Sequence, residues 1–433
     1  MSRLLGGART YTDTQLAETL AMLVAHAIKR RASDIHIEPQ DRLILIRYRI
    51  DGRLYGIHKL PRTALPGLLA QLKKLAGLKM GDTASPQEGS YETLVNQQTV
   101  RIHVATLPVL NGEKAVLHLQ TERGKPEDLA RLGFWGEGLA ALQHVLASPY
   151  GLVLVAGPRH SGVSSTLFSM LAALNTPLVN ITTIETRPAH RLPGVNQTFV
   201  NVDNGLHMHH ALQAALKQDP NIMMIGDLPD AATAELAVRT ATAGHLLLAG
   251  LHADSAAAGI LRLRSTTVEP FLLATALRAA VAQRLVRRLC TACRKRQQLS
   301  QEELRRVAAL FGIQDSGAWR RLHRLESAAL AAGLGAAHPL SSTPYGITTL
   351  WQAHEAGCSA CDHTGYNGQV AITEVLTSSS LLQRALLAPD IPSAARLQSS
   401  LLTNGFVPLA LDGLVKSLRG MTTITEVLRV ARS

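Results

Sequence analysis

The first 120 residues combine helical and strand-like patterns of hydrophobic positions. Leucine and alanine recur at helical spacing over residues 12–31 and 64–79. Polar and apolar residues alternate, wholly or in part, over residues 34–38, 42–49, 91–94, 99–106 and 114–120. These patterns predict a small α+β domain over residues 1–120.

A different pattern follows the polar stretch 121–128, which we interpret as a linker. Apolar runs of strand length occupy residues 151–156, 221–225 and 246–251, and amphipathic stretches separate them. Uniformly apolar strands that alternate with helices are typical of a parallel sheet with crossover helices. We therefore expect an α/β core of the RecA-like P-loop type over residues 129–289.

The last third of the chain has two predicted parts. Residues 290–366 contain all four cysteines, and the Ala-, Gly- and Ser-rich stretch 327–342 within them is expected to be a loop. Residues 367–433 are predicted to be a helical C-terminal region, most clearly from residue 381 onward.

Composition narrows the choice of partners without deciding it. The 433 residues carry a formal net charge of +12, which favours an anionic partner such as phospholipid, nucleic acid or an acidic protein. A basic surface with no special role explains the charge equally well. Aromatic residues make up only 4%, which argues against single-stranded nucleic acid bound by base stacking.

Hydropathy favours a cytoplasmic location. The first eleven residues lack an apolar run behind a basic head, so no signal peptide is expected. No apolar run approaches the roughly 20 residues that span a bilayer. We expect a soluble protein that is able to lie against a membrane.

The cysteines form two C-x-x-C pairs, Cys290 with Cys293 and Cys358 with Cys361. Two such pairs are the usual ligands of a tetrahedral four-thiolate zinc site. The separation of residues 293 and 358 exceeds the common spacing, but a metal limits distance in space rather than along the chain. Two disulfides, or four unrelated thiols, are the alternatives.

The most informative motif is the sequence GPRHSGVSS at residues 157–165. It lies between an apolar strand and a helical stretch, where backbone N–H groups and the helix dipole can bind phosphate. The predicted nucleotide-binding residues are Gly157, Arg159, Ser161, Gly162, Val163, Ser164 and Ser165. Residue 163 should be the lysine that reaches the β- and γ-phosphates, but it is valine.

Three further strands end in polar residues of the kind this chemistry needs. Glu185 ends a β-branched run, Asp227 follows an apolar run in the manner of a Walker-B carboxylate, and His252 ends a third run. In a parallel sheet, ligands lie beyond the carboxyl ends of the strands. The sequence therefore predicts that these three residues and the loop form one site.

Several blocks of the chain resemble one protein family. Residues 32–39 (ASDIHIEP) and 47–52 (RYRIDG) resemble the N-terminal domain of type II secretion and type IV pilus assembly ATPases. Matching blocks in the motor domain are 218–220, 244–245, 251–254 and 268–272. The run 282–290 (AQRLVRRLC) leads into a four-cysteine module like that of the secretion and pilus-extension branch, and residues 365–368 and 422–427 complete the resemblance.

The resemblance implies a hexameric cytoplasmic motor, peripheral at the inner membrane, that works with a membrane platform protein. It implies ATP and Mg²⁺ as cofactors beside zinc, and no nucleic acid. Gly157, Gly162 and Ser164 would hold phosphate and Mg²⁺. Glu185 would polarise the attacking water, Asp227 would take the Walker-B position and His252 would sense the γ-phosphate.

The departures from the family pattern concentrate in the same site. The Walker-B glutamate is Asp227, and His103, His118 and Ser90 stand where the family has arginines. Neutral histidine supplies neither the charge nor the planar fork of arginine. These changes predict weak or absent ATP hydrolysis, and hence a structural or regulatory partner of an active paralogue.

Two other functions remain open from the sequence. The first is a working ATPase whose missing cation is replaced by Arg159, Arg187 or a neighbouring subunit. The second, suggested by the net charge, is a nucleic-acid translocase.

Other polar clusters are given ordinary interpretations. Strand alternation explains Asp34 and His36, and a loop or helix start explains the histidines at 207, 209 and 210. The basic run 284–294 fits a solvated face, a subunit contact or a membrane-facing patch, and the sequence does not choose among them.

Overall fold

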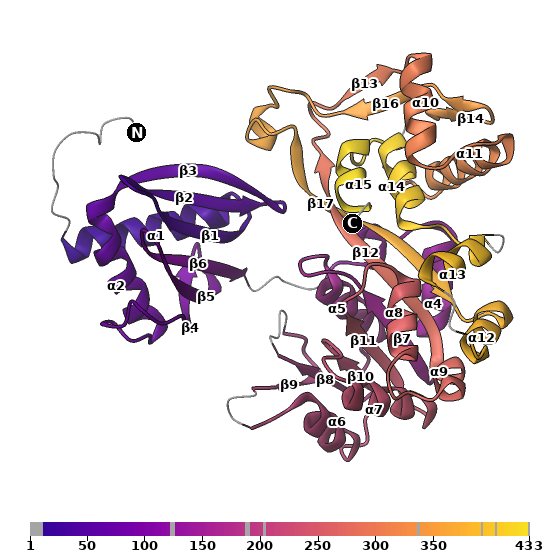
Figure 1. Cartoon of the computed structure of the whole chain (residues 1–433), viewed down its shortest axis with the longest axis horizontal. Helices are drawn as coiled ribbons and strands as arrows, with labels where there is room; N and C mark the ends of the chain where they lie inside the picture. The colour runs from indigo at the N-terminus through magenta and orange to yellow at the C-terminus, as the bar shows by residue number, and fades with distance from the viewer. Residues whose placement is uncertain are drawn as a thin grey trace. The chain divides into compact units, whose positions relative to one another are not determined.

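The computed structural model describes residues 12–121, 126–186, 191–201, 205–335, 338–390, 393–402 and 405–431. Its chain forms two compact units, Met1–Gly124 and Lys125–Ser433 (Figure 1). The boundary between them falls inside the stretch interpreted as a linker, of which residues 122–125 lie outside the described part. Each unit is considered by itself.

The N-terminal unit is a six-stranded antiparallel sheet with strand order β3-β2-β1-β6-β5-β4. Its elements are α1 (Asp13–Lys29), β1 (Ala32–Pro39), β2 (Leu43–Ile50), β3 (Arg53–Pro61), a 3₁₀ turn (Arg62–Ala64), α2 (Leu65–Ala76), β4 (Gln87–Val95), β5 (Gln98–Val109) and β6 (Gly112–Thr121). Because side chains alternate along a strand, Ile35 and Ile37 of β1 point into a core that both helices share. Asp34, His36 and Glu38 therefore lie on the opposite face of the sheet.

The C-terminal unit is built on a seven-stranded sheet with order β17-β12-β7-β11-β10-β8-β9. Its strands are β7 (Gly151–Ala156), β8 (Ile181–Glu185), β9 (Val195–Phe199), β10 (Ile222–Ile225), β11 (Leu246–Leu251), β12 (Leu277–Leu289) and β17 (Tyr366–Thr377). All neighbours pair in parallel except β17, which is antiparallel to β12. The predicted parallel core is therefore present, with one antiparallel strand added at its edge.

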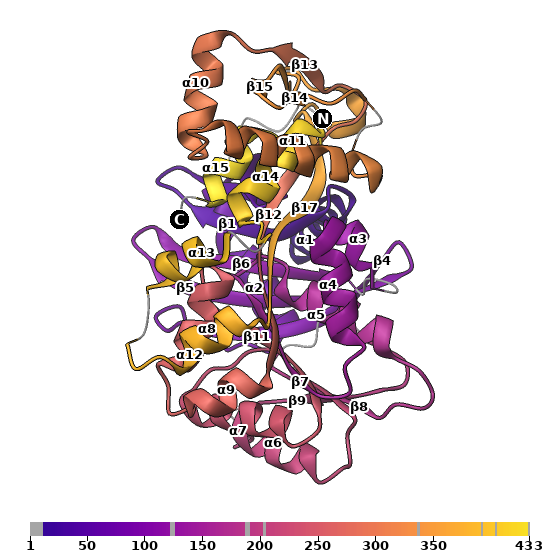
Figure 2. The same cartoon turned by 90° about the vertical axis from the view of Figure 1, so that its right-hand side faces the viewer.

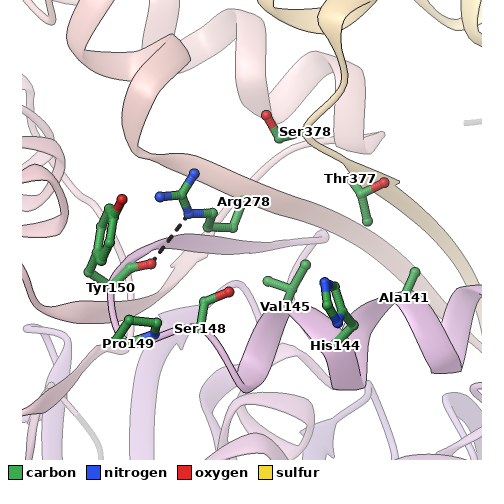
Figure 3. A pocket seen from close by; sticks show the side chains of 9 residues that line it. All are labelled: Ala141, His144, Val145, Ser148, Pro149, Tyr150, Arg278, Thr377 and Ser378. Atoms are coloured by element: carbon green, nitrogen blue, oxygen red, sulfur yellow. Dashed lines mark hydrogen bonds between the residues drawn. The ribbon is translucent and has the colours of Figure 1, made fainter.

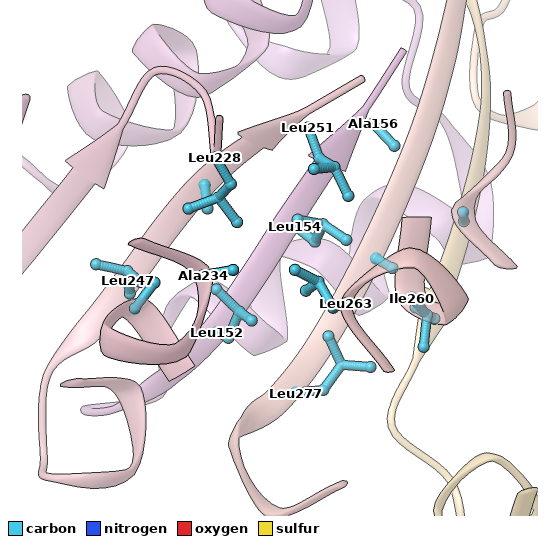
Figure 4. Packing of buried hydrophobic residues seen from close by; sticks show 14 of the residues in the cluster. Leu152, Leu154, Ala156, Leu228, Ala234, Leu247, Leu251, Ile260, Leu263 and Leu277 are labelled. Atoms are coloured by element: carbon cyan, nitrogen blue, oxygen red, sulfur yellow. The ribbon is translucent and has the colours of Figure 1, made fainter. Parts of the chain in front are cut away.

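Helices cover both faces of this sheet. Those of the core are α3 (Leu129–Leu132), α4 (Gly136–Leu146), α5 (Val163–Leu174), α6 (Met208–Leu216), α7 (Ala231–Thr242), α8 (Ala256–Arg264) and α9 (Pro270–Ala276). In the central strand β7, Leu152 and Leu154 pack with α7 and α8, whereas Val153 and Val155 pack with α4 and α5. Figure 4 shows the first of these two clusters. Burial on both sides explains why β7 reads as an uninterrupted apolar run.

The cysteine-containing module connects the end of β12 to the start of β17, where the two strands are paired. It contains β13 (Lys295–Gln298), α10 (Gln301–Leu310), α11 (Ser316–Ala331), β14 (Ser342–Thr343), β15 (Gly346–Ile347), β16 (Thr349–Gln352) and a 3₁₀ turn (Ser359–Cys361). Within the C-terminal unit it lies at the end remote from α6 and α7 (Figure 2). Residues 327–331, expected to be loop, instead complete α11, because Leu322, Glu326 and Ala329 form its buried face.

The C-terminal region is only partly the helical segment that was predicted. Its helices are α12 (Ser380–Leu387), α13 (Ala394–Leu401), α14 (Leu409–Leu418) and α15 (Ile424–Ala431), as expected from residue 381 onward. Residues 367–377, however, belong to strand β17, so the prediction of helix there is wrong. The β-branched residues Val370, Ile372 and Val375 favour a strand, and the segment pairs with β12. Among the described residues, no helix is long and apolar enough to cross a membrane.

Part of the basic run 284–294 is buried inside this unit. Arg284 contacts Asp254 at 3.3 Å, and Arg287 contacts Glu426 of α15 at 2.8 Å. The guanidinium of Arg294 stacks over the ring of Trp351 at 4.6 Å. These three arginines therefore hold the unit together, and none of them supports a membrane-facing patch.

Candidate functional site

The loop after β7 has a backbone that only glycine permits at two places. Gly162, the N-cap of α5, has φ +87°, in the left-handed region. A Cβ placed on Gly157 would lie 2.1 Å from the Ser161 Oγ, so the chain folds back tightly over that residue. The loop reaches α5 from the end of the central strand, which is the context that the sequence predicted.

The residues of this loop fit a phosphate. The Ser161 side chain is buried, and its Oγ has no hydrogen-bond partner in the described structure. The N-terminus of α5 has no side-chain cap. An oxyanion between them would satisfy both the hydroxyl and the free N–H groups of the first turn.

Val163 occupies the place of the missing lysine with an apolar contact. Its side chain is half-buried and packs against the cluster on the α5 face of the sheet. A Cβ added to Gly250 of β11 would lie 3.3 Å from the Val163 Cγ1, so the valine fills the space beside that strand. Arg159 is exposed on the turn of the loop, and Arg187, the other suggested cation, lies outside the described residues.

Asp227 and His252 meet beside the loop. The His252 Nδ1 lies 3.2 Å from the carbonyl oxygen of Gly157, and this nitrogen must be the donor because a carbonyl only accepts. The Nε2 of the same ring is 3.8 Å from the Asp227 Oδ2. Both side chains remain well exposed, so water or a cation can reach them.

Glu185 is held in a contrasting, buried environment. Its Oε1 accepts hydrogen bonds from the Thr183 hydroxyl at 2.7 Å and the Gln197 amide at 3.4 Å. Burial raises the pKa of this carboxyl above its usual value, and the two hydrogen bonds only partly oppose that effect. A Cβ on Gly226, the neighbour of Asp227, would lie 3.7 Å from the Glu185 Cγ.

The structure therefore brings the predicted residues to one edge of the sheet. Gly157 contacts His252, His252 faces Asp227, and Glu185 lies beside the residue that precedes Asp227. This arrangement could bind a phosphate and a divalent cation. What it lacks is a lysine at position 163.

Sequence reasoning missed one residue of this site, Gln283. Its amide donates to the Ser161 carbonyl oxygen at 2.8 Å and accepts from the Thr166 hydroxyl at 2.7 Å. Only the strand order, which sets β12 beside β7, shows that this side chain meets the loop. The sequence offered no signal beyond its place in the block 282–290.

The three positions that lack an expected arginine form one row across the N-terminal sheet. Ser90 pairs with His103, His103 with His118, and His118 with Asp34, so their side chains share a face. The His118 Nδ1 is 2.5 Å from the Asp34 Oδ1. The pKa of Asp34 is lowered despite burial, because its hydrogen bonds and positive neighbours outweigh desolvation.

Four cations on that face contact carboxylates. Arg49 contacts Asp34 at 3.2 Å, and Arg101 contacts Glu92 at 2.6 Å. The remaining pairs share one acid: Arg47 and Lys114 contact Glu38 at 2.7 and 2.8 Å.

The four cysteines lie together, as a shared metal requires. Their Sγ atoms are all within 4.8 Å of one another, with pairs at 3.8 and 3.9 Å. Zn–S bonds of about 2.3 Å in a tetrahedron give an S–S edge of about 3.8 Å. All four cysteines are free, so the two-disulfide alternative does not apply. Pairing of β12 with β17 brings the two C-x-x-C turns together and explains the long separation in sequence.

The other histidines of the described ranges do not form a comparable centre. His207 is the N-cap residue of α6, and its ring contacts that of His210 at 5.9 Å. Within the described ranges, only the four cysteines form a group of three or more residues suited to a metal.

A cavity of about 470 Å³ lies at the other end of the central strand (Figure 3). Arg278 stacks over the Tyr150 ring at 4.7 Å, and its Nε donates to the Tyr150 carbonyl oxygen at 3.3 Å. Tyr150 precedes β7, whereas the loop 157–165 follows it. The cavity is therefore separate from the candidate site.

Comparison with known proteins places these features in context. The family model described as "Type II/IV secretion system protein" matches residues 10–429. The type IV pilus assembly ATPase PilB of Thermus thermophilus is 35% identical over 406 residues, which cover 94% of this chain but only 42% of that protein. The type II secretion system protein E of Dickeya dadantii is 33% identical over 420 residues, covering 97% of this chain and 76% of that protein.

Solved structures support the fold. The ATPase DotB of Legionella pneumophila superposes with a TM-score of 0.65 at 17% identity, covering 99% of this chain and 98% of DotB. The pilus retraction motor PilT, solved with bound ADP, gives 0.55 at 17% identity and covers 95% of this chain and 96% of that chain. Matches at such low identity bear on the fold alone. The two superpositions confirm the predicted fold, an N-terminal domain followed by an ATPase domain.

Proposed function

Since the chain belongs to the type II/IV secretion system protein family, we propose that it is a motor subunit whose own nucleotide site hydrolyses ATP slowly or not at all. The observation that carries this proposal is Val163, an apolar side chain packed beside β11 where a phosphate-contacting cation would stand. The loop, Asp227, His252 and Glu185 keep the framework of the site. The charge that acts on the transferring phosphoryl group is missing.

The rate losses typical of such changes favour a strong reduction in the rate of ATP hydrolysis. Removing one preorganised electrostatic contact typically lowers the rate by about 10²–10³-fold, and removing an arginine finger by about 10³–10⁵-fold. Asp227 is one methylene shorter than the family's glutamate, so a water-bridged Mg²⁺ contact must move. Several such changes together leave little turnover.

The N-terminal unit supports the same conclusion. Ser90, His103 and His118 stand in one row, so the expected arginines are lost together from a single surface. On that face, Asp34, Glu38 and Glu92 are paired with Arg47, Arg49, Arg101 and Lys114. A nucleotide phosphate would therefore compete with carboxylates for these four cations.

One observation favours the alternative, a working ATPase with a substitute cation. Arg159 is exposed on the turn of the loop, two residues before Ser161, where its long side chain is free to swing toward a bound phosphate. If Arg159 does this, Arg159→Gln should abolish turnover by the unaltered protein.

Magnesium-dependent ATP hydrolysis by the purified, zinc-loaded full chain separates the two proposals. We expect a rate at the level of the Glu185→Gln variant, no further loss in Arg159→Gln, and tighter nucleotide binding in Val163→Lys. A rate typical of motor ATPases that falls in both Glu185→Gln and Arg159→Gln would establish the alternative.

We further propose that the subunit acts at the cytoplasmic face of the inner membrane, in a hexamer or a mixed oligomer with an active paralogue. The relatives named as pilus assembly and secretion proteins support this role. Zinc held by Cys290, Cys293, Cys358 and Cys361 would be structural, because all four positions are taken by thiolates. Co-purification with a paralogue and a platform protein from the native host tests the assembly.

A further inference from the structure

Gln283 is a buried polar residue in the middle of strand β12. It is 1% exposed, on β12, one residue beyond Ala282, which pairs with Ala156 at the end of β7. Position 283 therefore lies where the phosphate-binding loop leaves the sheet. A buried amide at such a place requires partners for both its donor and its acceptor.

The loop and the first turn of α5 supply those partners. The Gln283 Nε2 donates to the Ser161 carbonyl oxygen at 2.8 Å, and the Oε1 accepts from the Thr166 hydroxyl at 2.7 Å. One side chain thus joins the two ends of the turn that contains Gly162 and Val163.

Both glycines of the loop lie close to Gln283. A Cβ on Gly162 would lie 2.9 Å from the Gln283 Nε2, and a Cβ on Gly157 would lie 3.1 Å from the Gln283 carbonyl oxygen. The loop therefore closes directly onto β12. None of these contacts involves residue 163 or a bound phosphate.

We propose that Gln283 is the positioning residue of the loop and keeps its phosphate-binding shape when the lysine is absent. This inference rests on the proposed function in one respect, that the site is weak for lack of a cation at 163. The site is then latent: restoring the charge alone restores nucleotide binding, and the restoration depends on Gln283.

The chemistry of the amide decides which substitutions are informative. Gln283→Met keeps the length and volume but removes both hydrogen bonds, and Gln283→Glu keeps the acceptor but loses the donor to the Ser161 carbonyl. Thr166→Val and Thr166→Ser form a matched pair, because only serine retains the hydroxyl that Gln283 accepts from. Gln369→Met on the neighbouring strand β17 is a control for placing methionine in this part of the sheet.

The experiment measures binding of a fluorescent ADP analogue with Mg²⁺ to the zinc-loaded full chain. Val163→Lys should bind about ten- to a hundredfold tighter than the unaltered protein, the range expected for a charged hydrogen bond. Val163→Met, which adds length without charge, should not. Adding Gln283→Met or Thr166→Val to Val163→Lys should remove most of the gain, whereas Gln369→Met or Thr166→Ser should leave it.

Two results would overturn the inference. One is tight binding by the Val163→Lys, Gln283→Met double variant. The other is no gain in a folded Val163→Lys variant, which would mean that the loop has lost its shape. Because the Thr166 pair tests the same contact from the other side, poor folding of Gln283→Met leaves the test intact. Rapid hydrolysis by the unaltered protein would refute the proposed function but not the role of Gln283, which Gln283→Met alone would then test.

Discussion

Glu185 and Asp227 show how two neighbouring carboxylates differ with their surroundings. Glu185 is 4% exposed and accepts hydrogen bonds only from neutral groups, so its charged form is disfavoured and its pKa is raised. Asp227 is exposed and faces His252. A buried carboxylate of this kind suits proton transfer better than holding a cation, which agrees with the role that the resemblance implies.

The raised pKa of Glu185 predicts a pH-dependent stability. A carboxyl with a raised pKa in the folded state contributes stability that is fully present below its ordinary value and is lost as pH rises through the raised value. Glu185→Gln should therefore raise the melting temperature near pH 8 by about 2 °C or more. The gain should vanish near pH 4, where Glu185 is protonated in both states.

Differential scanning fluorimetry across this pH range measures the effect. Glu302→Gln, at an exposed position on α10, is the control and should show no such trend. An equal shift at both pH values would contradict the interpretation.

Among the helices and strands, hydrophobic periodicity predicted those whose apolar side chains pack into a core. The helices at 12–31 and 64–79 correspond to α1 and α2, and the apolar run 151–156 is β7. Strand β3 was missed because it is a largely exposed edge strand with no clear alternation. Strand β17 was included in the predicted helical region, although its β-branched residues Val370, Ile372 and Val375 favour a strand.

The same limit applies to the candidate site. Glycines, carboxylates and the cysteine pairs carry local patterns, so the sequence could predict them. Gln283 carries none, because its role comes from two strands that lie side by side only in the folded sheet.

Because β12 pairs with β17, a metal held by the four cysteines would link two segments that are distant in sequence. Cys290→Ser removes one thiolate of the four and should lower both zinc content and melting temperature, because metal binding is coupled to folding of the module. Ser359→Ala, a non-ligand position within the second pair, is the matched control. Metal analysis after dialysis, combined with thermal unfolding, checks the prediction. Unchanged zinc content in Cys290→Ser would show that these thiolates do not hold the metal.

A buried ion pair fastens α2 to the β5–β6 hairpin. The Lys73 Nζ lies 2.8 Å from the Glu113 Oε2, with both side chains almost fully buried, and it also donates to the Asp82 carbonyl oxygen at 2.6 Å. Lys73→Met should destabilise the N-terminal unit by about 3 kcal/mol or more, because it leaves the Glu113 charge buried and alone.

Hydrogen exchange of β5 and β6 amides in the full chain measures this loss. The double variant Lys73→Met, Glu113→Gln should recover part of it, since no unpaired charge then remains. The explanation would be contradicted if the double variant lost more stability than the two single variants lose in sum.

At the scale of the whole molecule, the two units lose the same kind of group. The C-terminal unit has valine at the lysine position of its loop, and the N-terminal unit has serine and histidines in a row where arginines are expected. Each unit has its own hydrophobic core, and the C-terminal unit also contains the four-cysteine cluster. The fold is that of the family, and the proposed loss of phosphate-contacting charge involves both units.

The turnover number of the zinc-loaded full chain with saturating Mg²⁺ and ATP decides between an impaired and a working nucleotide site. Enzymes typically turn over at about 10 s⁻¹, and loss of one preorganised contact lowers that by about 10²–10³-fold. We predict a rate of about 0.01 s⁻¹ or below, indistinguishable from that of Glu185→Gln. A rate of about 1 s⁻¹ or more that Glu185→Gln abolishes would contradict it.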